Sequence, residues 1–422
     1  MRLGGRLAAA GEVLRDIEQR RRPVADALKD WGLSHRFAGS GDRAAIGNIV
    51  YDALRRKRSL GWAMGSDEPE AIVEGALYHG WGYATDTLAE ALDGDRHAPK
   101  LFASYDPGRL ENAPPAVRAD VPDWTLDALG ATFGDDLLTE ADALAERPPL
   151  DLRVNTIKAD RERVLGELKR YGAEPTPHAP DGIRIPVTEG AGRVPNVTAE
   201  EGYRKGRFEV QDAGSQLVAL LGVPEKAGGR VLDYCAGAGG KTLAISAAMG
   251  NRGQVHAYDA DMQRLAPIHD RLARAGVRSA QVHRPGSDLS DLRDRMDTVL
   301  IDAPCTGTGT WRRRPDAKWR LRETTVERRH EEQDAVLDQA APFVRPGGTL
   351  VYVTCSLLAS ENGGRVATFL ERNEDFEWVP TEGRSDAFDT APKRDDGRGG
   401  AILSPGRTET DGFYAAVLRR RS

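Results

Sequence analysis

Two of the three cysteines in this chain follow apolar, strand-like runs, at positions where a thiol could do chemistry. Cys305 belongs to the segment Asp302-Ala-Pro-Cys-Thr-Gly-Thr-Gly309, and Cys355 belongs to Val351-Tyr-Val-Thr-Cys-Ser356. A thiolate is a strong nucleophile that can form a transient covalent bond with a substrate. The two segments therefore predict an active site with two thiols.

The third cysteine, Cys235, stands in a glycine-rich turn after another strand-like run. The segment reads Val231-Leu-Asp-Tyr-Cys-Ala-Gly-Ala-Gly-Gly-Lys-Thr242. Such a turn brings backbone amides close to an anionic ligand at the start of a helix. The triphosphate-binding motif needs glycine where Cys235 stands, and the dinucleotide-binding motif needs glycine where Thr242 stands. The spacing therefore disfavours both of these ligands.

S-adenosylmethionine fits the same turn better. Asp259 closes the next strand-like run, where its carboxylate can accept hydrogen bonds from both ribose hydroxyls, and Asp288 follows the third run, near the adenine amino group. One aspartate at such a position is often only a helix cap, but acidic residues at consecutive strand ends form a pattern. The predicted cofactor-binding residues are Cys235, Ala236, Gly237, Ala238, Gly239, Gly240, Lys241, Asp259, Asp288 and Asp302.

Two thiols beside a methyl donor fit the methylation of carbon 5 of cytosine. This carbon is a poor nucleophile, and addition of a thiolate at carbon 6 makes it enamine-like, so that it can take the methyl group. Loss of the carbon 5 proton and elimination of the thiol then restore the ring. Asp302, as a carboxylic acid near ring nitrogen 3, would stabilise the charge formed on addition. The chemistry alone does not order the two thiols.

A basic segment with two tryptophans follows the Cys305 motif. Such a run is usually a solvated face, and the net charge of −6 argues against a generally basic surface. Its place beside a candidate catalytic loop, with rings that can stack on bases, favours contact with RNA instead. The predicted RNA contacts are Arg312, Arg313, Arg314, Lys318 and Arg320, interleaved with Trp311 and Trp319.

The chain is long enough for two or three domains. Apolar residues at helical spacing predict an all-helical domain over residues 1–137. Short strand-like runs around a helical stretch predict a small α+β subdomain over residues 138–208. Strands and helices alternate over residues 209–422, which predicts a doubly wound, mostly parallel α/β sheet with an antiparallel edge.

The predicted strands place the chemical residues at one edge of this sheet. Strand-like runs cover residues 229–234, 254–258, 297–301 and 349–354. Ligands of doubly wound sheets bind beyond the carboxyl ends of the strands. The thiols, the glycine turn and the acidic residues all follow such ends, which predicts one shared site.

Composition predicts a cytoplasmic protein without a metal, whereas the RNA partner is predicted from the basic segment and the cytosine chemistry. No segment approaches the roughly 18 to 20 consecutive apolar residues of a membrane-spanning helix, and no signal sequence is expected. Three cysteines without regular spacing argue against a disulfide framework, and neither a Cys-x-x-Cys motif nor a histidine cluster is present for zinc. The oligomeric state is not indicated.

Taken together, the motifs resemble the RNA cytosine-5 methyltransferases of the Nol1/Nop2/Sun group. The resemblance rests on the Pro-Cys and Thr-Cys-Ser segments, the glycine turn, Asp411-Gly-Phe413 and Arg153-Val-Asn-Thr156, and it extends from residue 151 to the C-terminus. It implies a Rossmann-like methyltransferase domain with Cys355 as the nucleophile and Cys305 as the residue that assists product release.

The N-terminal region is similar to the NusB-like RNA-binding domain of the bacterial Sun or RsmB type, through Asp42-Arg-Ala-Ala-Ile-Gly-Asn-Ile-Val-Tyr51. This similarity implies small-subunit ribosomal RNA as the substrate. Transfer RNA, or a catalytically silent RNA-binding ribosome assembly factor, are the alternatives. Two positions depart from the family pattern: Ala238 replaces the usual proline, and Gly286-Ser-Asp288 replaces the usual Gly-Asp-Ala, which leaves the adenine contact of Asp288 open.

Overall fold

The structure, a computed structural model, describes all 422 residues of the chain. Its contacts divide the chain into two compact units. The first unit holds residues 1–148, 187–194 and 311–321, and the second holds residues 149–186, 195–310 and 322–422. None of the helices combines the length and the apolar character that crossing a membrane requires.

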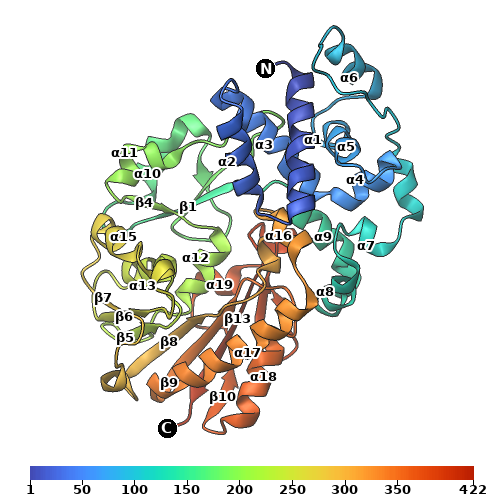
Figure 1. Cartoon of the computed structure of the whole chain (residues 1–422). Coiled ribbons are helices and arrows are strands. Elements are labelled where there is room, and N and C mark those ends of the chain that lie inside the picture. The colour runs from blue at the N-terminus through green and yellow to red at the C-terminus, as the bar shows by residue number, and fades with distance from the viewer. The chain divides into compact units, whose positions relative to one another are not determined.

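The first unit is helical, as predicted (Figure 1). α1 buries Leu7, Leu14 and Ile17 along one face, because residues three, four and seven apart share a side of a helix. α5 is buried on nearly all sides and forms the centre of this unit's core. The helices are α1 (Leu3–Arg20), α2 (Val24–Ser34), α3 (Ser40–Arg55), α4 (Lys57–Met64), α5 (Pro69–Gly80), α6 (Thr85–Leu92), α7 (Pro115–Arg118), α8 (Leu126–Phe133), α9 (Leu137–Ala145) and α16 (Pro315–Arg320).

The division into units differs from the predicted domain boundaries. The boundary expected at residue 137 falls at the start of α9, which belongs to the first unit, so this unit continues to residue 148. The subdomain expected over residues 138–208 forms no unit of its own, because residues 138–148 and 187–194 belong to the first unit and the others share the second unit with the larger sheet. The helical unit also includes residues 187–194 and 311–321. Both segments lie far along the chain from residues 1–148, which form the rest of the unit.

A small antiparallel sheet opens the second unit. Its strand order is β2-β3-β1-β4, with β1 paired to both β3 and β4. α10 (Arg161–Leu168) covers it through Val164 and Leu168, which pack with the buried strand residues. The strands are β1 (Leu150–Val154), β2 (Glu174–Pro175), β3 (Gly182–Ile185) and β4 (Phe208–Val210). The predicted α+β character of this segment is confirmed.

A nine-stranded sheet carries the candidate site. Its order is β11-β12-β13-β9-β8-β5-β6-β7, with β10 beside β13. The pairs from β7 across to β9 are parallel, and β13 runs antiparallel to β9, which confirms the predicted sheet and its antiparallel edge. The strands are β5 (Arg230–Asp233), β6 (Gln254–Tyr258), β7 (Ala280–His283), β8 (Met296–Asp302), β9 (Val344–Thr354), β10 (Phe376–Val379), β11 (Arg394–Asp395), β12 (Ala401–Leu403) and β13 (Phe413–Arg420).

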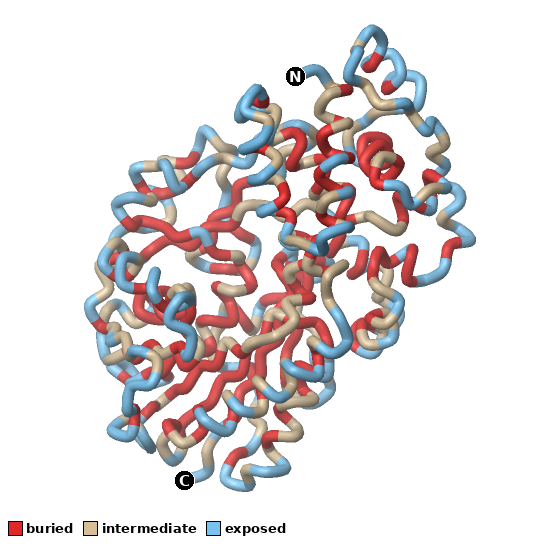
Figure 2. Tube along the Cα trace, in the orientation of Figure 1, coloured by how far each residue is buried: buried red, intermediate tan, exposed pale blue.

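Helices cover both faces of this sheet (Figure 1). Val351 and Val353 of β9 point to one face, where they pack with Leu217 of α12. Figure 2 shows that buried residues run continuously along the central strands. The helices of this unit are α10, α11 (Glu201–Arg204), α12 (Ala213–Leu220), α13 (Gly240–Ala248), α14 (Met262–Leu265), α15 (Ile268–Ala275), α17 (Glu323–Ala340), α18 (Gly363–Arg372), α19 (Asp386–Thr390) and α20 (Pro405–Thr408).

The strand order also sets where a ligand can bind. From β5 the chain proceeds to β6 and β7 on one side and later to β8 and β9 on the other. The order therefore reverses between β5 and β8. At such a switch point the loops beyond the carboxyl ends diverge and leave a crevice for a ligand.

Candidate active site

The two thiols expected to share a site are brought together. β8 and β9 are parallel neighbours with Asp302 opposite Val353, so the loops after both strands leave the same edge of the sheet. Cys305 and Cys355 lie on these loops with their Sγ atoms 3.4 Å apart. Both cysteines are free. The arrangement allows one sulfur to share a proton with the other.

The environment of Cys305 keeps its thiol protonated. The hydrogen bond with Cys355, together with burial, raises the pKa of the Cys305 thiol well above its usual range. Cys305 therefore keeps its proton and can donate it in a hydrogen bond to the Cys355 sulfur. Burial, followed by the charge of Asp259, likewise raises the pKa of Cys235, which keeps that thiol protonated and poorly nucleophilic.

A buried glutamate holds both cysteine loops. Glu361 is 0% exposed, and its carboxyl group accepts hydrogen bonds from the Thr306 amide at 2.9 Å and the Ser356 hydroxyl. The Thr306 hydroxyl also donates to Glu361, at 2.5 Å. Gln333 Nε2 adds a fourth hydrogen bond, at 3.0 Å, and also donates to the Pro304 carbonyl at 2.9 Å. Thr306 and Ser356 are the residues that directly follow the two cysteines. Neither Glu361 nor Gln333 was singled out from the sequence as a functional residue, and Glu361 lies five residues beyond the Thr-Cys-Ser segment.

Glycine contacts pack the same loops against β13. The Gly309 amide donates to the Cys355 carbonyl at 2.9 Å, and the Gly412 amide donates to the Gly309 carbonyl at 2.8 Å. A Cβ atom at Gly309 would overlap the Gly412 backbone, so only glycine fits there. The Asp-Gly-Phe segment, whose Phe413 begins β13, therefore packs through Gly412 against the loop that carries Cys305.

The glycine turn after β5 has the shape expected of a cofactor cradle. Gly237 and Gly239 have φ angles of 49° and 82°, in the left-handed region that favours glycine. A Cβ atom at Gly237 or Gly240 would meet nothing closer than 3.7 Å, so the space over the turn is open. At Gly239 a Cβ atom would instead clash with Ile268, which seats the turn on α15.

Two aspartates border this turn. Asp259 is 4% exposed, and its carboxylate accepts from the Gly237 amide at 2.9 Å and the Asp261 amide at 2.8 Å. Asp233 is fully buried, accepts from Thr242 Oγ1 at 2.6 Å, and has no partner for its other oxygen. Burial raises the pKa of Asp233 to about 7. An open glycine turn after β5, with an acidic residue directly after β6, fits S-adenosylmethionine.

Lys241 and Asp302 connect the cofactor turn to the thiol loops. Lys241 Nζ lies 2.6 Å from Asp302 Oδ2, and its side chain is 7% exposed. The same ammonium lies 5.5 Å from the centroid of the Phe413 ring. The predicted catalytic and cofactor-binding sets therefore meet at Asp302. Asp288, by contrast, is exposed. Its carboxylate accepts a hydrogen bond from the Ser290 amide at 2.8 Å and so caps a short turn.

The basic segment differs from the predicted RNA-contacting surface. Lys318 is 3% exposed, and its Nζ donates to the Arg55 carbonyl at 2.9 Å, while burial lowers its pKa to about 8. Arg312 is 5% exposed, and its carbonyl accepts from Arg55 Nε at 2.8 Å. Arg320 donates to Asp316 at 2.8 Å. Burial within the helical unit keeps Arg312 and Lys318 from meeting a phosphate. The Lys318 ammonium faces the Arg55 carbonyl and the rings of Trp311 and Trp319. Contacts by partly buried Arg313 and exposed Arg314 stay predictions.

Comparison with known proteins gives two matching family models. The model described as 16S rRNA methyltransferase RsmB/F matches residues 220–419. The model of the ferredoxin-like domain of RsmF/B-like methyltransferases matches residues 121–188. The first match contains the glycine turn and both cysteine loops.

Individual relatives agree with these models. The probable ribosomal RNA small subunit methyltransferase B of a Synechocystis species is 32% identical over 456 residues, which cover 97% of this chain and 98% of that protein. The ribosomal RNA small subunit methyltransferase B of Escherichia coli is 34% identical over 304 residues, 71% of this chain and 66% of that protein. Among solved structures, a methyltransferase homologue from Pyrococcus horikoshii matches with a TM-score of 0.59 and 26% identity, over 72% of this chain and 97% of its own.

Proposed function

Because this chain belongs to the RsmB/F family of 16S rRNA methyltransferases, we propose that it methylates carbon 5 of a cytosine in small-subunit ribosomal RNA, in the cytoplasm. The observation that carries the proposal is the pair of thiols after β8 and β9, with Sγ atoms 3.4 Å apart. A nitrogen or oxygen acceptor has a lone pair with which to attack a methyl group. Carbon 5 of cytosine lacks one and needs covalent activation, which a thiol supplies.

Cys355 is the proposed nucleophile. Its thiolate adds to carbon 6 of a cytosine that has left its stack, and the ring electrons move toward nitrogen 3 and carbon 5. Cys305, held protonated beside it, donates a hydrogen bond to the Cys355 sulfur and does not compete for the negative charge. The order of the two thiols follows from the family resemblance, and the contact between their Sγ atoms is compatible with it.

Asp302 is the proposed partner of ring nitrogen 3. The Lys241 ammonium lies beside its carboxyl group and can supply a proton, so the pair can stabilise the charge that develops on the ring. S-adenosylmethionine, when bound, supplies the electrophilic methyl group. The open turn at Gly237 and Gly240, with the Asp259 carboxylate at its border, is where this chain would hold it.

Cys305 is the proposed base for the final step. The hydrogen bond with Cys355, burial and the charge of the Cys355 sulfur all raise the pKa of Cys305, and a Cys355 sulfur bonded to carbon 6 no longer carries that charge. The Cys305 thiol then gives its own proton to solvent, and the resulting thiolate takes the proton from carbon 5. The electron pair of that C–H bond restores the ring double bond, and the Cys355 sulfur leaves as a thiolate.

Ribosomal RNA is favoured over transfer RNA because the relatives reported above carry the names of small-subunit ribosomal RNA enzymes. A catalytically silent assembly factor is disfavoured by the two thiols, which would have no reason to lie within hydrogen-bonding distance.

The test is methyl transfer to an unmodified small-subunit ribosomal RNA transcript from S-adenosylmethionine with a labelled methyl group. After digestion to nucleosides, we expect the label in 5-methylcytidine with the wild-type protein and no label with Cys355→Ala. Label in a different nucleoside would contradict the proposed target atom. Label retained in 5-methylcytidine by Cys355→Ala would contradict the proposed nucleophile.

A further inference from the structure

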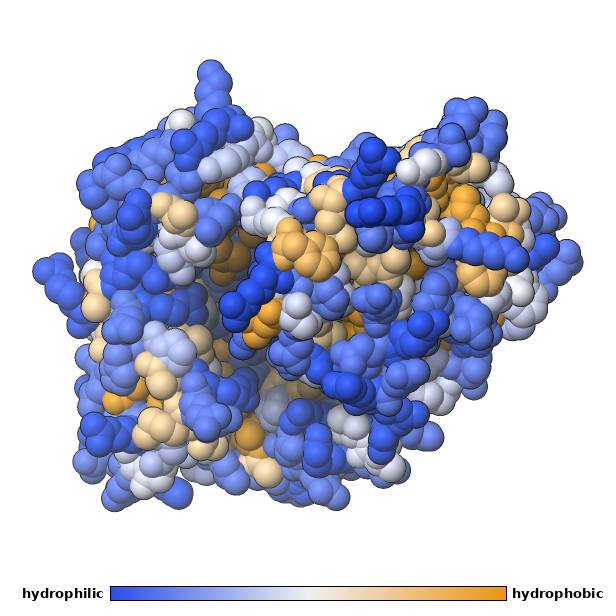
Figure 3. Space-filling model, turned by 45° about the horizontal axis from the view of Figure 1, so that its top comes forward, coloured by the Kyte–Doolittle hydropathy of each residue, from blue (hydrophilic) through white to orange (hydrophobic).

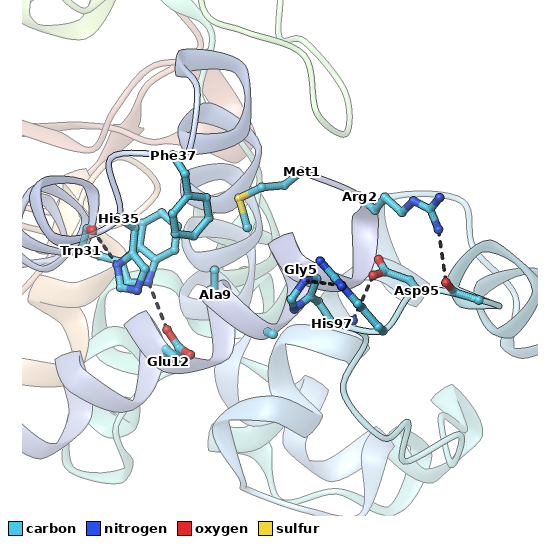
Figure 4. Close-up of a pocket in the computed structure, with 13 residues that line it drawn as sticks. Met1, Arg2, Gly5, Ala9, Glu12, Trp31, His35, Phe37, Asp95 and His97 are labelled. Atoms are coloured by element: carbon cyan, nitrogen blue, oxygen red, sulfur yellow. Dashed lines mark hydrogen bonds between the residues drawn. The ribbon is translucent and has the colours of Figure 1, made fainter.

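A cavity of about 730 Å³ lies within the helical unit, away from every residue assigned above (Figure 4). It is bordered by α1, by the chain between α2 and α3, and by the loop after α6. Its floor consists of small residues of α1, Gly5, Ala8 and Ala9. A cavity of this size falls within the range of about 300 to 1,000 Å³ that is usual for sites of small organic groups.

One wall of the cavity is aromatic. The rings of Trp31 and His35 stack with centroids 4.3 Å apart and planes 11° apart, and Phe37 stands edge-on to His35 at 5.7 Å. Trp31 Nε1 donates to Glu12 Oε2 at 3.1 Å, which fixes the orientation of the indole. Phe37 is 72% exposed, although a ring of its size is usually covered. The wall therefore offers flat, partly uncovered rings to a ligand.

The opposite wall is cationic. Arg2 donates to the Gly94 carbonyl at 3.2 Å, and Arg96 Nε donates to His97 Nε2 at 3.2 Å. Each guanidinium has five N–H donors, so both keep further donors for an anion. Asp95, on the same loop, accepts from the Gly4 amide at 3.0 Å and the His97 amide at 3.1 Å. Its carboxylate is therefore already engaged by backbone donors.

We propose that this cavity binds one unpaired nucleotide of the RNA substrate, with the base against His35 and Phe37 and a phosphate at Arg2 and Arg96. The inference rests on the proposed function, which supplies RNA as the substrate class. Proteins bind single-stranded RNA by stacking unpaired bases on aromatic rings and neutralising the backbone with cations, and this cavity separates the two chemistries on facing walls. A base-paired nucleotide cannot present its face to the rings.

The surface around such a site need not be basic as a whole. The face in Figure 3 is mostly hydrophilic, with hydrophobic residues in small groups, and the net charge of the chain is −6. Affinity for a phosphate depends on the local cations, because charges farther away than about 8 Å are largely screened at physiological salt.

The experiment measures the Kd of the full-length protein for a fluorescently labelled single-stranded RNA decamer and for a duplex of the same length. Phe37→Ala is expected to weaken single-strand binding about 5- to 150-fold, as loss of one stacked base predicts, and duplex binding less than twofold. Phe37→Trp, which keeps a stacking ring, is expected to retain the wild-type Kd. The matched control is Phe102→Ala, since Phe102 is 40% exposed in the same unit and does not line the cavity.

A second variant tests the cationic wall. Arg96→Gln is expected to weaken single-strand binding and to lower the slope of log Kd against log salt concentration by about 0.7. Unchanged single-strand binding by both Phe37→Ala and Arg96→Gln would overturn the inference. Equal losses of affinity for the duplex and for the single strand would also overturn it. Cytidine monophosphate binding as tightly as the decamer would overturn it too, because it would indicate a site for a free nucleotide.

The same proteins separate this inference from the proposed function. If the wild type forms 5-methylcytidine and Phe37→Ala binds RNA normally, the inference alone fails. If Phe37→Ala loses single-strand binding while the wild type forms no 5-methylcytidine, the proposed function fails and the nucleotide site stands. The control for folding is the Tm of each variant in thermal unfolding, which is expected to equal that of the wild type.

Discussion

The Sγ atoms of Cys305 and Cys355 lie 3.4 Å apart, although 50 residues separate the two cysteines in the chain. Parallel pairing of β8 with β9 sets Asp302 opposite Val353 and so sends both cysteine loops to one edge of the sheet. A disulfide would need an S–S distance of about 2.05 Å, and both thiols are free. One sulfur can therefore attack while its neighbour carries the proton.

The first prediction concerns the covalent intermediate. With S-adenosylmethionine and small-subunit ribosomal RNA, Cys305→Ala is expected to accumulate a protein–RNA adduct, because the base that removes the carbon 5 proton is missing. Cys355→Ala is expected to form none, because the nucleophile is missing. A denaturing gel measures the adduct directly. Accumulation in Cys355→Ala in place of Cys305→Ala would reverse the roles of the thiols.

The second prediction concerns Glu361, which positions both cysteine loops without touching the substrate. Glu361→Gln replaces an acceptor oxygen with an NH₂ group that faces the Thr306, Ser356 and Gln333 donors, so the loops are expected to shift. A displacement of about 1 Å costs roughly 100-fold in rate. We expect kcat for methyl transfer to fall by about this factor while KM for RNA stays within about twofold.

The control for Glu361→Gln is Glu371→Gln, on the exposed side of α18, which is expected to keep the wild-type kcat. Urea unfolding should show a loss of about 1 to 3 kcal/mol for Glu361→Gln, since a buried donor is left unpaired. A normal kcat with reduced stability would assign Glu361 to folding alone.

The third prediction separates exposed from buried cations in the segment after Cys305. Arg314→Gln is expected to weaken RNA binding and to reduce its salt slope by about 1, because Arg314 is exposed. Lys318→Gln is expected to leave that slope unchanged, because its Nζ faces the Arg55 carbonyl. Binding titrations at several salt concentrations measure both slopes. A change of slope with Lys318→Gln but not with Arg314→Gln would refute this division.

The fourth prediction concerns the buried Asp233 carboxyl group. Its pKa in the folded protein is about 7, above the ordinary value of 3.8, so the folded state binds the proton more tightly than the unfolded state. The contribution of Asp233 to stability is thus full below pH 3.8 and is lost as pH rises toward 7. Asp233→Asn removes this dependence.

The difference in unfolding free energy between Asp233→Asn and the wild type should therefore rise with pH from about 4 to 7, by at most about 1.4 kcal/mol per pH unit. Urea unfolding across this range, without added cofactor, measures it. A difference that stays constant with pH would mean that Asp233 titrates in the folded protein as it does in the unfolded chain.

Much of the candidate site was predictable because its signals are local. The strands before Cys235, Asp302 and Cys355 are short apolar runs, and the glycine turn follows one of them directly. Parallel strands share one carboxyl edge, so the meeting of Cys305 with Cys355 follows once the sheet is recognised. The helical character of the first unit likewise follows from apolar residues repeated at helical spacing.

Other features depended on contacts between segments far apart in the chain. Glu361 became a central acceptor only because Gln333 and Thr306 pack around it. The sequence predicts Arg312 and Lys318 as exposed cations that contact RNA. Residues 311–321 instead belong to the helical unit, in which both side chains are buried. Residue types and local periodicity therefore determined the strands, the helices and the reacting groups. Burial and hydrogen-bond partners were decided by tertiary packing, because they depend on which distant segments come to lie against each side chain.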